Sequence, residues 1–160
     1  MTVTRAADYA ARFRTVNDDA IATVSSCTDE QWQLPSVAEG WTVAALAHHI
    51  AEVNGAFAGI VRKLAGGDSY TPSVSMEAIH ENNAKHAKEY AEADRAETLD
   101  LLRTNGTAIV DTLSVIAETD WDRVAGVFGG HELTIAQVIE YVVIGHTAEH
   151  LGSIQATLNG

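Results

Sequence analysis

The chain has 160 residues, with 22 acidic and 10 basic side chains and a formal net charge of −12. This length fits a single domain with its own core, and so acidic a surface repels phosphate backbones and anionic lipids. We therefore expect neither nucleic acid nor a membrane as a partner. The sequence has no signal-peptide pattern, no run of roughly 20 apolar residues and a single cysteine, Cys27, which we expect in the core. A cytoplasmic location is the resulting expectation.

Apolar residues at steps of three and four predict the first two helices. The first helix covers about residues 4–26. A connection that contains Pro35 leads to the second helix, which begins after the N-cap Thr42 and stops at Gly66-Gly67. The apolar stripe of the second helix, which we expect to face the core, consists of Leu46, Ile50, Val53, Phe57, Ile60 and Leu64.

The second half of the chain predicts two further helical segments. The third covers about residues 76–118 and is highly charged in its first half, with a bend expected near Ala93-Asp94 or around Asn105-Gly106. The fourth is capped by Thr134 and runs nearly to the C-terminus. No β-type alternation is long enough to require a sheet. The sequence therefore predicts an all-α four-helix bundle, with residues 1–160 as one domain.

His48 and His49 are neighbours on the second predicted helix, and helical geometry separates their directions. Each residue turns by about 100°, so His49 lies at the edge of the apolar stripe, about 60° from its centre. His48 points away from the stripe, at about 160°. We expect His49 to face the interior of the bundle.

His146 and His150 lie four residues apart on the last predicted helix. Ile135, Ile139 and Val142 define its core direction, and His146 falls about 20° from Ile135 with His150 about 40° further round. A rise of about 6 Å over four residues places the two imidazoles one above the other, where both can bind one ion. Burial of two imidazoles without a partner would cost free energy.

His49, His146 and His150 are therefore the predicted ligands of one divalent metal ion. Three protein ligands leave a coordination position for water or substrate, the arrangement of a catalytic zinc site. An ion there lowers the pKa of bound water or of a bound thiol, which favours a nucleophilic anion near neutral pH. The alternative is that these histidines are merely buried and hydrogen-bonded in the core.

The remaining candidates have weaker support from the sequence. His80 and His86 lie in a charged segment, where we expect them to be solvated, and His131 follows two glycines in an expected surface loop. Glu149 and Glu52 lie next to ligand positions, and each either orients a histidine or is simply a solvated helix carboxylate. The sequence contains no glycine-rich phosphate loop and no recognised nucleophile motif.

Two stretches together resemble a known superfamily: DEQWQLPSVAEGWTVAALAHHIAEV and, far downstream, LTIAQVIEYVVIGHTAEHLGSI. They are similar to the DinB-like (YfiT-like) superfamily, and the first is also similar to the metal-binding domain of mycothiol-dependent maleylpyruvate isomerases. The resemblance implies an up-down-down-up four-helix bundle, often a homodimer, with zinc or nickel bound by the histidines that match His49, His146 and His150.

The resemblance also implies a reaction class. Several members are similar to S-transferases or isomerases that use a low-molecular-weight thiol such as mycothiol or bacillithiol on an electrophilic small molecule. Two departures limit the transfer. The isomerase type can place a glutamate where this chain has His146, and the sequence ends soon after the last predicted helix, without the additional C-terminal domain of some of those enzymes. A non-catalytic bundle that binds a metal or a ligand is the alternative function.

Overall fold

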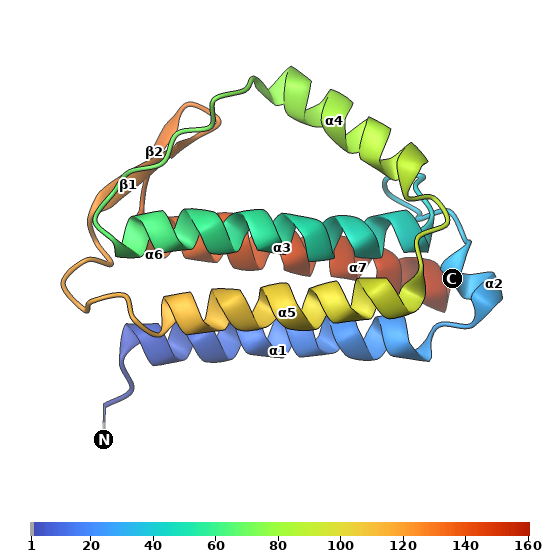
Figure 1. Ribbon diagram of the computed structural model, residues 1–160, viewed down its shortest axis with the longest axis horizontal. Helices are drawn as coiled ribbons and strands as arrows, with labels where there is room; N and C mark the ends of the chain where they lie inside the picture. Colours follow the sequence, from blue (N-terminus) through green and yellow to red (C-terminus); the bar gives the residue numbers. More distant parts are fainter. Residues whose placement is uncertain (1) are drawn as a thin grey trace.

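Each apolar stretch with helical spacing forms a long helix in the computed structural model, which describes residues 2–160 (Figure 1). The long helices pack side by side, with α5 against both α1 and α3, and α7 against α3 and α1. They are α1 (Arg5–Ser26), α3 (Val43–Ala65), α5 (Arg95–Leu113) and a final stretch made of α6 (Ile135–Gln137), the π-helix η1 (Val138–Ile144) and α7 (Gly145–Asn159).

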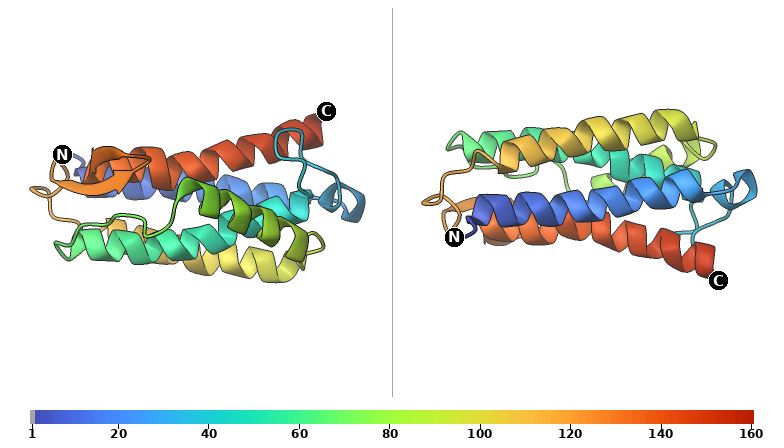
Figure 2. Two further views of the ribbon diagram at one scale, coloured as in Figure 1. Left: turned by 90° about the horizontal axis from the view of Figure 1, so that it is seen from above. Right: turned by 90° about the horizontal axis from the view of Figure 1, so that it is seen from below.

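The chain direction follows the expected up-down-down-up order. In Figure 1, α1 and α7 run in one direction along the bundle, and α3 and α5 both run in the other. Two successive long helices can run in parallel only if the chain travels back along the bundle between them. The segment that contains α4 (Met76–Glu89) makes this return across the outside of α3 (Figure 2).

Side-chain caps fix where the helices begin, as the sequence predicts. The backbone N–H of Ala45 donates to Thr42 Oγ1 at the start of α3, and that of Gln137 donates to Thr134 Oγ1 at the start of α6. Each contact satisfies a backbone donor that the first helical turn leaves unpaired.

The third predicted segment is two helices rather than one bent helix. The break falls at the first of the two expected places, because Asp94 accepts from the N–H of Glu97 and caps a new helix, α5. At the second place α5 continues without a break. A Cβ on Gly106 would lie 2.2 Å from Nδ2 of Asn17, so this glycine allows α1 and α5 to approach closely.

The expectation that no sheet is present is wrong. The strands β1 (Val124–Phe128) and β2 (His131–Thr134) pair in antiparallel fashion around Gly129-Gly130, both of which have positive φ. The strands have only five and four residues, and the register shifts after Val124. The alternation of apolar and polar residues is therefore too short to predict strands from the sequence.

The core extends along the bundle as two clusters. One, near the hairpin, includes Phe13, Leu64 and Trp121. The other, near α2 (Asp29–Trp32), includes Leu46 and Cys27, which is buried as expected. Among residues 2–160, no helix is long and apolar enough to cross a membrane.

Candidate metal centre

The structure brings together the histidines that the sequence singled out. His49 projects from α3, while His146 and His150 project from the adjacent α7. One ring nitrogen from each lies within 4.8 Å of the others, and Nε2 of His49 is 3.1 Å from Nε2 of His146. Nitrogens bound to one zinc ion at about 2.0–2.1 Å stand about 3.3 Å apart in a tetrahedron. The donor set therefore fits a divalent ion with small side-chain movements.

Burial keeps the inner members of this triad uncharged. Removal from water, together with the neighbouring His150 and His86, lowers the pKa of His49 to about 4. Burial likewise lowers the pKa of His146 to about 3, with His150 and His49 as further causes. Neutral imidazole is the form that donates a lone pair to a metal, so His49 and His146 are in their ligand form at neutral pH.

The helix that carries two of the histidines is not regular, contrary to the sequence analysis. A regular α-helix does not extend from Ile135 to His150, because Val138–Ile144 form a π-helix with more residues per turn. The inward direction shifts accordingly, so Val142 is only half-buried while Val143 is completely buried. His146 and His150 lie beyond the irregularity, one turn apart on the regular α7.

Glu39 is the residue of this site that the sequence analysis missed. Its carboxylate lies 3.0 Å from Nδ1 of His150 and also accepts from Ser153 and Ser36. Burial raises the pKa of Glu39, but the hydrogen bonds from Ser153, His150 and Ser36 outweigh it and lower the pKa. The ionised carboxylate accepts the Nδ1 hydrogen of His150 and leaves the Nε2 lone pair free for an ion.

A tight loop before α3 places Glu39. The N–H of Gly40, at φ 72°, donates to the carbonyl of Ser36, and the N–H of Ser36 donates to the carbonyl of Trp41. Trp41 then packs edge-on against His49, with ring centroids 5.6 Å apart. The sequence signal that could have identified Glu39 is its position in Glu39-Gly40-Trp41, directly before the helix that carries His49. Glu149, which the sequence offered as an orienting carboxylate, is exposed.

Two histidines lie in surroundings that the sequence did not predict. His48, expected to point away from the core, is only 8% exposed, and His86, expected to be solvated, has a side chain that is 12% exposed. The reason is that α4 folds back over the outer face of α3 (Figure 2). The two imidazoles stack on one another between these helices, with ring centroids 5.0 Å apart. His80 and His131 are exposed, as expected, but His131 begins the strand β2 rather than lying in a loop.

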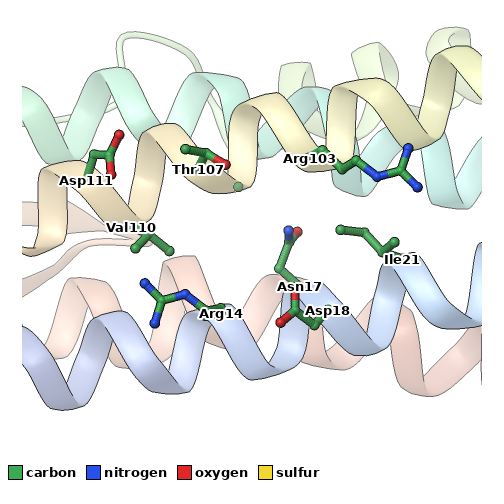
Figure 3. A pocket seen from close by; sticks show the side chains of 9 residues that line it. Arg14, Asn17, Asp18, Ile21, Arg103, Thr107, Val110 and Asp111 are labelled. Atoms are coloured by element: carbon green, nitrogen blue, oxygen red, sulfur yellow. The ribbon is translucent and has the colours of Figure 1, made fainter.

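A groove of about 240 Å³ lies between α1 and α5 and contains none of these histidines (Figure 3). Arg14 and Asp18 reach it from α1, and Arg103 and Asp111 reach it from α5. Its charged side chains are of both signs, and its lining includes no histidine or cysteine.

Comparison with known proteins assigns the chain to a family. Residues 13–149 match the family described as the mycothiol maleylpyruvate isomerase N-terminal domain. The chain belongs to this family. The matched region includes His49 and His146, and His150 directly follows it. No curated protein matches the chain.

Two solved structures share the fold of this family member. YfiT from Bacillus subtilis, reported as "a probable metal-dependent hydrolase with an unusual four-helix bundle topology", is 18% identical with a TM-score of 0.75, over 99% of this chain and 89% of YfiT. The mycothiol-dependent maleylpyruvate isomerase is 17% identical with a TM-score of 0.71, over 96% of this chain. The chain spans only 63% of that isomerase.

Proposed function

We propose that this family member binds one divalent ion, zinc or nickel, on His49, His146 and His150 and catalyses a thiol-dependent S-transfer or isomerisation of an electrophilic small molecule. The observation that carries the proposal is the convergence of one nitrogen from each histidine within 4.8 Å. Membership of a family described by a mycothiol-dependent isomerase supports a thiol as the cosubstrate.

Each side chain of the site has a separate role in this proposal. His49 and His146 would hold the ion from the adjacent helices α3 and α7, and their low pKa values keep them unprotonated. Glu39 fixes the ring of His150, so that its Nε2 faces the ion. A bound divalent ion would lower the pKa of a thiol and so supply a nucleophile at neutral pH.

Access to the site is consistent with an external cosubstrate. His146 and His150 are half-buried rather than fully enclosed, whereas His49 is only 3% exposed. The expected homodimer stays a prediction, which light scattering on the purified chain would check.

The test is a turnover assay with tag-free, zinc-loaded protein. Mycothiol or bacillithiol and the electrophile monochlorobimane serve as substrates, and conjugation is followed by fluorescence. We expect His49→Ala and His150→Ala to lose the protein-dependent rate, while His131→Ala, at the exposed hairpin, retains it. Equal rates in all variants would contradict the proposal. Zinc binding without turnover would instead establish the alternative, a non-catalytic binding protein.

A further inference from the structure

A second group of metal-ligand side chains lies between α3 and α4, outside the triad. His48 and Glu52 are four residues apart on α3, and His86 comes from α4. One ligand atom from each lies within 4.8 Å of the others. The spacing on α3 places an imidazole and a carboxylate on one helical face, and the crossing of α4 brings a second imidazole to them.

The contacts within this group converge on a single nitrogen. Nε2 of His86 lies 2.7 Å from Oε2 of Glu52 and 2.9 Å from Nδ1 of His48. Hydrogen bonding holds all three together only if a hydrogen on His86 Nε2 is shared between two acceptors. A divalent cation at this point accepts a lone pair from each of the three atoms at once.

Aromatic packing holds the rings in place before any ion binds. Tyr90, at the C-terminal end of α4, stacks on His48 with ring centroids 3.8 Å apart and lies 4.5 Å from the ring of His86. The side chain of Glu52 is 55% exposed and opens the group to solvent. The two short distances, from His86 to Glu52 and to His48, need to lengthen by only a fraction of an ångström to reach the roughly 3.3 Å spacing around a tetrahedral zinc ion.

We propose that His48, Glu52 and His86 form a second divalent-cation site. Two imidazoles and one carboxylate favour zinc or a similar borderline ion over calcium or magnesium. The site adjoins the triad, since the ring of His86 lies 5.6 Å from that of His49. It does not depend on the proposed function, because it shares no ligand with the triad.

The experiment measures metal stoichiometry rather than activity. Tag-free, chelator-treated protein is titrated with Zn²⁺ in a calorimeter, and bound zinc is counted by elemental analysis after gel filtration. We expect the unmodified chain to bind two ions. We expect Glu52→Gln and His86→Gln each to weaken one binding event by at least about tenfold and leave the other unchanged. His80→Gln, an exposed change on the same helix as His86, is the matched control.

A triad variant separates this inference from the proposed function. His49→Ala combined with His150→Ala should remove one ion and leave the one that depends on Glu52. If the unmodified chain binds a single ion that Glu52→Gln and His86→Gln do not affect, the group is only a hydrogen-bonded cluster and the inference is overturned. If the triad variant binds as many ions as the unmodified chain, the proposed function fails while the second site stands. Thermal melts of every variant check that the fold is retained.

Discussion

The carboxylate of Glu39 lies 3.0 Å from Nδ1 of His150, so a loop ahead of α3 orients an imidazole on α7. The loop and the helix are far apart in sequence, and the contact joins the two halves of the candidate metal centre. Because Glu39 also accepts from Ser153 at 2.6 Å, it is anchored to the same helix as the histidine that it orients.

Glu39→Gln tests this orienting role. The amide keeps the size of the side chain but loses the negative charge that favours hydrogen on Nδ1 of His150. We expect zinc affinity at the triad to fall by about 10–100-fold, the usual effect of losing a partner of a ligand histidine. Calorimetry measures the change. Glu149→Gln, an exposed change beside His150, should leave the affinity unaltered, and an equal loss in both variants would contradict the prediction.

Zinc should stabilise the fold through the triad. An ion at 100 times its dissociation constant contributes about 2.7 kcal/mol, which corresponds to roughly 5–11 °C in Tm for a chain of this length. We expect this shift in Glu52→Gln, which isolates the triad from the second proposed site. Adding His49→Ala to that variant should abolish it. A calorimetric melt with and without zinc gives the comparison, and a persistent shift would show that the ion binds elsewhere.

The metal-free protein should lose stability as the pH falls below neutrality. The pKa of His49 is about 4 in the folded state and about 6.5 when unfolded, so the unfolded chain binds more protons between these values. The full stability is therefore present above about pH 6.5 and declines toward pH 4. At pH 5 the expected loss is about 2 kcal/mol from His49 alone, and His146, whose pKa is lowered to about 3, adds to it.

Urea unfolding of chelator-treated protein at pH 7 and pH 5 measures this dependence. His49→Gln should show a smaller loss between the two pH values, because one of the titrating groups is gone. A loss of the same size in His49→Gln would assign the pH dependence to other groups. His131→Gln, at an exposed position, is the control.

Gly106→Ala tests the close approach of α1 and α5. The new Cβ would lie 2.2 Å from Nδ2 of the buried Asn17, so the helices or the amide must move. We expect a destabilisation of about 1–3 kcal/mol by urea unfolding, the usual cost of overpacking. Gly59→Ala, inside α3 with nothing within 4 Å of its Cβ, should instead stabilise the chain by about 0.5–1 kcal/mol. Destabilisation by both would point to helix bending rather than steric contact.

Local sequence signals account for most of the helical architecture. Thr42 and Thr134 cap helices where the sequence places them. Most of the predicted α3 stripe is buried, although Val53 and Ile60 are only half-buried. These features depend on neighbours within one or two helical turns, so the sequence alone contains the information. The hairpin was not predicted, because its strands are too short to show a clear alternation of apolar and polar residues.

The candidate metal centre was also only partly predictable from the sequence. The chain itself determined which helices carry His49, His146 and His150 and that the last two share one face. Only the tertiary structure decided that Glu39 orients His150 and that His48 and His86 are buried together, since both depend on segments that meet after long connections. Helical periodicity gives the direction of a side chain relative to its own axis. It cannot show that α4 folds back over the outward face of α3, because that packing is set by contacts between residues distant in the sequence.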